Sequence, residues 1–167
     1  DYDVLLEGIK SQHKDQETLI SLDEAGEILQ AQLEQSLATQ TEENKARGAD
    51  YLKSHAEKEG VQVTEAGLQY IVITEGDGIK PKATDEVTVH YRGTLIDGTE
   101  FDSSKGETTP MTLNVIPGFK EALTTMPVGS LWKLYIPSTL AYKDQRRSAK
   151  LGPNSTLIFE LELKEIK

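Results

Sequence analysis

The chain has 167 residues and a formal net charge of −10 at pH 7, from 28 acidic and 18 basic side chains. A surface of this sign repels the phosphate backbone, so nucleic-acid binding is not expected. No run of about 20 apolar residues occurs, so no membrane-spanning helix is expected. Cysteine is absent, which excludes disulfides, thiolate nucleophiles and cysteine metal sites.

The composition changes near residue 66. Residues 1–66 hold 15 acidic and 6 basic side chains, a net of −9, whereas residues 67–167 hold 13 and 12, a net of −1. Eight of the ten aromatic residues and all six prolines follow residue 66. We therefore expect a helical N-terminal arm over 1–66 and a compact domain with the functional pocket over 67–167.

Helical patterns dominate the first part. A short helix is expected within residues 1–14, and Ser21 with Glu24 forms a capping box that starts a second helix. We predict one long helix from about residue 22 to 59, ended by Gly60, with two helices broken near Gly48 as the alternative. Its first turns carry an apolar stripe: Leu22, Ala25, Leu29, Leu33 and Leu37.

Short alternating runs replace this pattern after residue 61. Strands are predicted at 68–73, around 87–91, at 131–136 and at 156–163, with a hairpin on the Asp97-Gly98 turn. A short helix is predicted over 117–125. These elements indicate an α+β domain, an antiparallel twisted sheet wrapped on one short helix, preceded by an all-α segment.

Several short motifs follow one another in the second part. They are His90-Tyr91-Arg92-Gly93, Asp97-Gly98, Phe101-Asp102-Ser103-Ser104, Val115-Ile116-Pro117-Gly118-Phe119, Met126-Pro127-Val128-Gly129, Ile136-Pro137, Leu140-Ala141-Tyr142 and Asn154-Ser155-Thr156-Leu157-Ile158-Phe159-Glu160. In this order over residues 67–167 they closely resemble the FKBP-type peptidyl-prolyl cis/trans isomerases. The N-terminal part resembles the bacterial Mip-type subfamily, named for the macrophage infectivity potentiator, whose members dimerise through a helical arm.

The resemblance implies an enzyme that isomerises Xaa-Pro bonds of peptides and unfolded proteins and so assists folding. It implies catalytic roles for Tyr91, Phe101, Asp102, Phe119 and Tyr142, and substrate contacts from Met111, Val115, Ile116, Leu151 and Phe159. Phe119 would be the floor under the proline ring, where the family most often has Trp. Tyr142 would donate a hydrogen bond to a substrate carbonyl, and Asp102 would orient the wall with Tyr91.

Three departures from the family pattern affect this site. The loop after Tyr142 lacks the usual glycine and carries four basic residues within 143–151, which could change substrate preference or macrolide binding. Met111 replaces a usual aromatic, and the segment before Val115 is one residue short. Trp132 lies away from the floor motif and is interpreted as a packing or surface residue of its strand.

The resemblance implies proline-containing polypeptides as substrates, macrolides as inhibitors and a homodimer through the N-terminal helices. No cofactor is expected, and no metal, because the three histidines lack ligand spacing. The expected location is the periplasm or cell envelope of a bacterium, with the cytoplasm as the alternative. Two other functions stay open: a chaperone or binding module on the same fold with little isomerase activity, and a purely structural dimerisation protein.

Overall fold

A computed structural model of the chain describes residue 6 and residues 21–167. Contacts between residues divide the chain into two units, Asp1–Thr39 and Gln40–Lys167. The short helix expected within residues 1–14 lies outside the described residues, apart from Leu6.

The long helix α2 runs without a break from Leu22 to Ala56. Its capping box is confirmed: the Ser21 amide donates to Glu24 Oε2 at 2.9 Å, and the Glu24 amide donates to Ser21 Oγ at 3.2 Å. The helix ends three residues before the predicted end, and Gly60 follows with a left-handed φ of 81°. The alternative with a break at Gly48 is wrong, because that residue lies inside the continuous helix.

Three apolar side chains of α2 in the first unit are exposed: Leu29 and Leu33 of the predicted stripe, and the neighbouring Ile28. Ile28, Leu29 and Leu33 are 47%, 46% and 55% exposed. Apolar side chains in water at helical spacing are typical of a surface that another element or molecule covers.

The second half of α2 packs against the C-terminal domain along one face. Asn44 Nδ2 donates to the Pro153 carbonyl at 2.8 Å. One turn on, Gly48 is buried against Thr156, whose Oγ1 would overlap any Cβ at this position. The missing side chain thus lets the helix approach the chain just before strand β7 (Leu157–Ile166) closely.

The last turns of α2 are held by a buried polar cluster. His55 is only 2% exposed, and its Nδ1 lies 2.9 Å from Gln69 Oε1. Gln69 Nε2 donates to the Leu52 carbonyl at 2.8 Å, so Gln69 Oε1 is the acceptor and His55 Nδ1 carries the proton. The ring of Tyr135 packs on His55 at a centroid distance of 3.7 Å.

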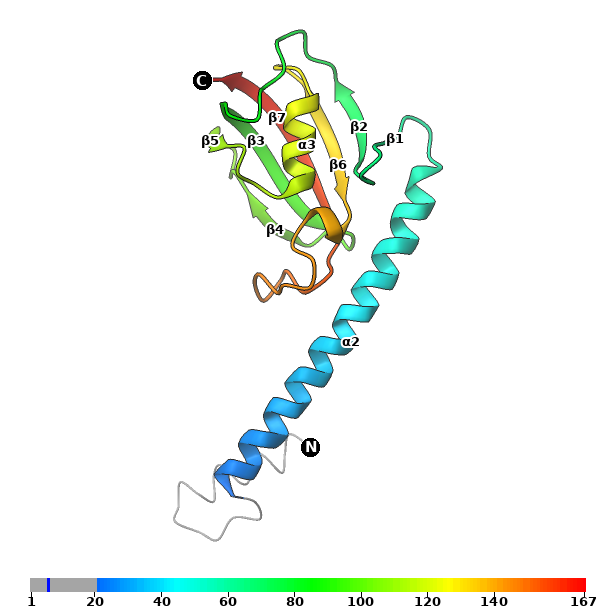
Figure 1. Cartoon of the computed structure of the whole chain (residues 1–167), viewed down its shortest axis with the longest axis vertical. Helices are drawn as coiled ribbons and strands as arrows, with labels where there is room; N and C mark the ends of the chain where they lie inside the picture. The colour runs from blue at the N-terminus through cyan, green and yellow to red at the C-terminus, as the bar shows by residue number, and fades with distance from the viewer. Residues whose placement is uncertain (1–5, 7–20) are drawn as a thin grey trace. The chain divides into compact units, whose positions relative to one another are not determined.

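The C-terminal domain is built on an antiparallel seven-stranded sheet (Figure 1). The order is β1-β2-β6-β7-β3-β4, with β5 also paired to β3. The strands are β1 (Gln62–Val63), β2 (Gln69–Thr74), β3 (Glu86–Leu95), β4 (Glu100–Ser103), β5 (Thr109–Thr112), β6 (Leu131–Ile136) and β7. The predicted α+β class is confirmed, with the correction that the two-residue β1 lies inside the segment expected to be all helical.

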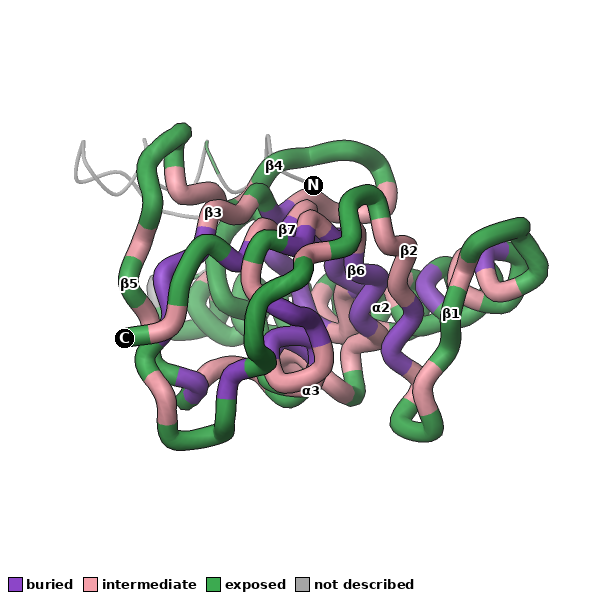
Figure 2. The backbone as a smooth tube through the Cα atoms, turned by 90° about the horizontal axis from the view of Figure 1, so that it is seen from above, coloured by how far each residue is buried: buried purple, intermediate pink, exposed green. Residues whose placement is uncertain are grey.

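Helix α3 (Pro117–Thr125) lies across one face of this sheet, as predicted (Figure 1). Pro117 at its start is favoured because a first-turn amide needs no partner within the helix. Phe119, Ala122 and Leu123 point into the core and are at most 3% exposed. Figure 2, in which the chain is coloured by residue burial, shows buried residues along α3 and the central strands. Apolar side chains from β3, β6 and β7 complete this core: Val87, Val89, Leu134, Ile136, Leu157, Leu161 and Leu163.

Trp132 belongs to the packing of the sheet. Its side chain is 3% exposed and stacks on Tyr70 at 4.4 Å. Its indole Nε1 has no hydrogen-bond partner among the described residues. This residue therefore fills the core beneath β2 and β6.

Candidate active site

Four aromatic rings from four elements meet between α3 and the sheet. Phe119 on α3 contacts Phe159 on β7 edge to face, with centroids 5.0 Å apart. Tyr91 on β3 lies 6.2 Å from both of these rings, and Phe101 on β4 lies 5.5 Å from Phe159. Edge-to-face contacts of this kind hold each ring in one orientation, so the cluster is a preorganised apolar surface.

A glycine makes room for this cluster. Gly93 pairs with Phe159 on one side and with Asp102 on the other. A Cβ on Gly93 would lie 2.7 Å from Phe159 and 2.8 Å from Phe101, closer than ordinary contact. In the sequence Tyr91-Arg92-Gly93, Tyr91 thus contributes a ring to the cluster, and Gly93 leaves space for the rings of Phe101 and Phe159.

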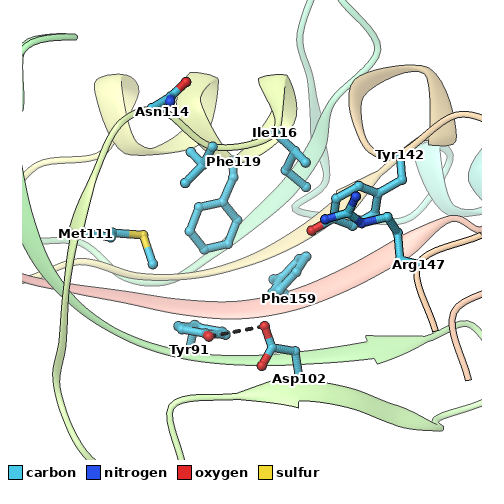
Figure 3. Close-up of a pocket in the computed structure, with 10 residues that line it drawn as sticks. Tyr91, Asp102, Met111, Asn114, Ile116, Phe119, Tyr142, Arg147 and Phe159 are labelled. Carbon is cyan, nitrogen blue, oxygen red and sulfur yellow. Dashed lines mark hydrogen bonds between the residues drawn. The ribbon is translucent and has the colours of Figure 1, made fainter. Parts of the chain in front are cut away.

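Three of these rings, Tyr91, Phe119 and Phe159, form part of the lining of an open cavity of about 470 Å³ (Figure 3). Phe119 and Phe159 are nearly buried beneath it, at 3% and 5% exposure. The size suits a proline ring with its neighbouring residues, and the lining is mainly apolar with a few polar groups. It consists of Tyr91, Asp102, Met111, Asn114, Val115, Ile116, Phe119, Tyr142, Arg147 and Phe159.

One wall carries a hydroxyl-to-carboxylate hydrogen bond. Tyr91 donates through its hydroxyl to Asp102 Oδ2 at 3.2 Å (Figure 3). Burial raises the pKa of Tyr91 above its ordinary value of 10.0, and the negative charge of Asp102 raises it further. Tyr91 is therefore a neutral donor at physiological pH, and it fixes the orientation of Asp102.

Tyr142 and Arg147 line the cavity side by side. Tyr142 follows the 3-10 turn η1 (Ser138–Leu140), and the guanidinium carbon of Arg147 lies 4.9 Å from the Tyr142 ring centroid. No hydrogen bond of the Tyr142 hydroxyl is formed within residues 21–167. This hydroxyl is available as a donor to a bound molecule.

Eight of the ten expected site residues line the cavity, and two do not. Phe101 packs behind Phe159, and Leu151 is 5% exposed beneath its loop. Asn114 and Arg147 line the cavity but were not expected there. Arg147 could have been suspected from the basic composition of its loop, whereas nothing in the sequence distinguishes Asn114.

The site offers shape, low polarity and a few hydrogen-bond donors. Within residues 21–167 and Leu6, no group of three or more histidine, aspartate or glutamate side chains could hold a metal ion. In the same part of the chain, no helix is long and apolar enough to cross a membrane.

Comparison with known proteins assigns the family. Residues 77–164 match the family described as FKBP-type peptidyl-prolyl cis-trans isomerase, and residues 1–72 match the domain amino-terminal to such isomerases. The chain belongs to the FKBP-type isomerase family. This confirms the family, and the presence of its N-terminal domain, that the sequence motifs indicated.

FKBP-type relatives in bacteria are similar over most of this chain. The FKBP-type 22 kDa peptidyl-prolyl cis-trans isomerase of Escherichia coli is 56% identical over 72% of the chain and 60% of its own length. The Outer membrane protein MIP of Legionella longbeachae is 47% identical over 75% of the chain and 55% of its own length. The chain thus spans little more than half of these two relatives.

A solved FKBP-type structure matches the whole chain. The crystal structure of FkpA from Escherichia coli superimposes with a TM-score of 0.81 at 37% sequence identity, covering 100% of this chain and 82% of that one. The long helix and the antiparallel sheet with its short helix are therefore an arrangement that this family uses.

Proposed function

We propose that this protein is a peptidyl-prolyl cis/trans isomerase that acts on Xaa-Pro bonds of peptides and unfolded proteins. The observation that carries the proposal is the aromatic cavity over Phe119 and Phe159, in a chain of the FKBP-type family. It is open at one side, so a residue within a polypeptide can enter without a free chain end.

The cavity favours the twisted amide over the planar one. Rotation about an Xaa-Pro bond faces a barrier of about 18–20 kcal/mol, which arises from amide resonance. A twisted amide loses this resonance and its charge separation, so transfer from water to an apolar surface costs it less than the planar form. The aromatic floor therefore lowers the barrier by differential binding, without a nucleophile or a proton-transfer group.

Three polar side chains of the cavity have positioning roles in this mechanism. The free hydroxyl of Tyr142 donates to a substrate carbonyl and fixes the chain beside the proline. The Tyr91–Asp102 pair holds its wall in place. Phe119, which lies under the cavity, supports the proline ring. Met111 on β5, and Val115 and Ile116 just before α3, add apolar lining.

The test is isomerisation of short Xaa-Pro peptides measured by exchange NMR. The wild type should accelerate exchange, Tyr142→Phe should reduce kcat/KM by about threefold to tenfold for one lost hydrogen bond, and Phe119→Ala should reduce it further. Because Phe119 is in the core, circular dichroism must show that Phe119→Ala is folded. If it is not folded, Tyr142→Phe carries the test, because that variant loses only a hydroxyl. A folded wild type with the background rate would refute the proposal.

Three further properties belong to the same proposal. Residues 67–167 would be the catalytic domain and 1–66 the arm, and a macrolide that fills the cavity would inhibit. A role in the bacterial envelope is supported by the relative named as an outer membrane protein. A binding module without activity is not favoured, because the similar proteins are named isomerases.

We also propose a homodimer through the N-terminal part of α2. Ile28, Leu29 and Leu33 give an exposed apolar stripe on that segment, and the same stripe of a second copy would cover it. Light scattering after size exclusion should give a dimer mass for the wild type and a monomer mass for Leu29→Lys/Leu33→Lys. A wild type that is monomeric at all concentrations would contradict this.

A further inference from the structure

The loop that borders the cavity has a charge opposite to that of the protein. This rim loop, residues 143–151, contains Lys143, Arg146, Arg147 and Lys150 against one acid, Asp144, a net of +3 on a chain of net −10. All five side chains are exposed. None of the salt bridges formed within residues 21–167 includes one of these cations.

Two of the rim-loop cations turn to backbone oxygens. Arg146 Nε donates to the Ser148 carbonyl at 3.3 Å, and Lys150 Nζ donates to the Glu100 carbonyl at 3.3 Å. Neither residue lines the cavity. These cations stabilise the loop rather than face a bound molecule.

Arg147 differs from them in both respects. It lines the cavity beside Tyr142, and its guanidinium lies over the Tyr142 ring at 4.9 Å (Figure 3). Its backbone amide donates to the Leu151 carbonyl at 3.0 Å, which fixes the loop at this point. Stacking engages only the flat face of a guanidinium, so the N–H donors in its plane stay available for an acceptor.

The carboxylate that lines the same cavity forms no ion pair with Arg147. Asp102 lines the same cavity but accepts from Tyr91, and no ion pair joins it to Arg147. In Figure 3 the Asp102 carboxylate points to the Tyr91 hydroxyl, whereas Arg147 lies beside Tyr142. The cavity therefore has a cation that no salt bridge within residues 21–167 engages, beside Tyr142.

We propose that Arg147 forms an anionic subsite, which binds the carboxylate of an Asp or Glu side chain adjoining the substrate proline. This inference rests on the proposed isomerase function. The Arg147 guanidinium carbon lies 4.9 Å from the centroid of the Tyr142 ring. If Tyr142 holds a substrate carbonyl beside the proline, Arg147 is then close to the residues that adjoin the proline, because consecutive Cα atoms are only about 3.8 Å apart. A planar guanidinium suits a carboxylate through two parallel hydrogen bonds, and among the described residues that line the cavity Arg147 is the cationic one.

The test compares isosteric charged and neutral substrates. We would measure kcat/KM by exchange NMR on Ala-Xaa-Pro-Phe and Ala-Leu-Pro-Xaa peptides in which Xaa is Glu or Gln. At one of the two positions the wild type should prefer Glu by about threefold to tenfold, as expected for a rim-exposed charged hydrogen bond. The preference should fall toward one in 1 M salt, where the screening length is about 3 Å.

Arg147→Gln should bring the Glu-to-Gln ratio of kcat/KM to about one; the ratio is the readout, because any other change that the variant makes to the cavity acts on both peptides. Arg146→Gln is the matched control, because it removes the same charge from the same loop outside the cavity, and it should keep most of the preference. A wild type that accelerates the Gln peptides but shows no Glu preference at either position would overturn the subsite alone. Equal effects of the two variants would also overturn it, since the attraction would then belong to the whole loop. No acceleration of any peptide would instead refute the isomerase function.

Discussion

Replacing Gly93 by alanine is the sharpest test of how the aromatic cluster is built. The added Cβ would lie 2.7 Å from Phe159 and 2.8 Å from Phe101. Phe159 cannot retreat easily, because Phe119 contacts it at 5.0 Å and it is only 5% exposed. The strain should therefore move one ring into the cavity or separate β3 from its neighbours.

Two opposing effects set the magnitude. Alanine in place of glycine in a strand stabilises by about 0.5–1 kcal/mol, because the unfolded chain has less freedom. Overpacking of a filled core costs about 1–3 kcal/mol. Because both contacts are with rings fixed on other sides, we expect the packing cost to exceed the gain, with a net destabilisation of about 1–2 kcal/mol and a loss of kcat/KM.

Urea unfolding followed by tryptophan fluorescence would measure the change in stability, and exchange NMR the activity. Gly93→Ala/Phe101→Leu should recover part of the loss, because Leu is shorter than the ring that Cβ meets. Gly26→Ala is the control for an unhindered site, since a Cβ there has nothing within 4 Å. If Gly93→Ala is as stable and as active as the wild type, the cluster is not tightly packed and the reasoning is wrong.

Three further outcomes are expected. The raised pKa of Tyr91 means that its stabilising effect is complete below its ordinary value of 10.0 and is lost as pH rises through the folded value. Tyr91→Phe should reduce the alkaline loss of unfolding free energy measured against pH, and part of the loss should remain, because burial also raises the pKa of Tyr51 and of Tyr135. Lys143 has a left-handed φ of 53°, so Lys143→Val should lower the free energy of unfolding in urea by about 1 kcal/mol or more, whereas Lys143→Gly should change it little; equal effects of the two would contradict this. Gly48→Ala should destabilise despite a helix-propensity gain of about 1 kcal/mol, and Gly48→Ala/Thr156→Ala should melt higher than Gly48→Ala alone, because Thr156 Oγ1 occupies the space.

Local signals predicted most of the secondary structure. The capping box placed the start of α2, and the proline at position 117 placed the start of α3. The structure adds β1 and β5, which have two and four residues. β5 contains Pro110, which cannot donate to a strand ladder, and such short segments depend on pairing with distant strands. Their existence is a property of the sheet rather than of their own sequence.

The cavity was predictable to the extent that its residues lie in regular elements. Phe119 and Phe159 lie in α3 and β7, where the position in the element fixes the direction of the side chain. Arg147 lies in a loop whose course depends on contacts such as that between the amide of Asn154 and the carbonyl of Lys143 at 2.6 Å. A loop has no repeating sequence pattern from which its path can be predicted, so the direction of the Arg147 side chain could be determined only from the structure.

The contact between α2 and the C-terminal domain bears on how this protein can be divided. An excised fragment that starts at residue 67 would expose Thr156 and Tyr135 to water and would leave the amide of Gln69 without its partners on His55 and Leu52. The smallest fragment that folds by itself should therefore begin near Gln40, where the second unit starts. For the same reason, a chimera that exchanges arms between relatives should be joined before Asn44, so that the packed turns of the helix stay with their own sheet.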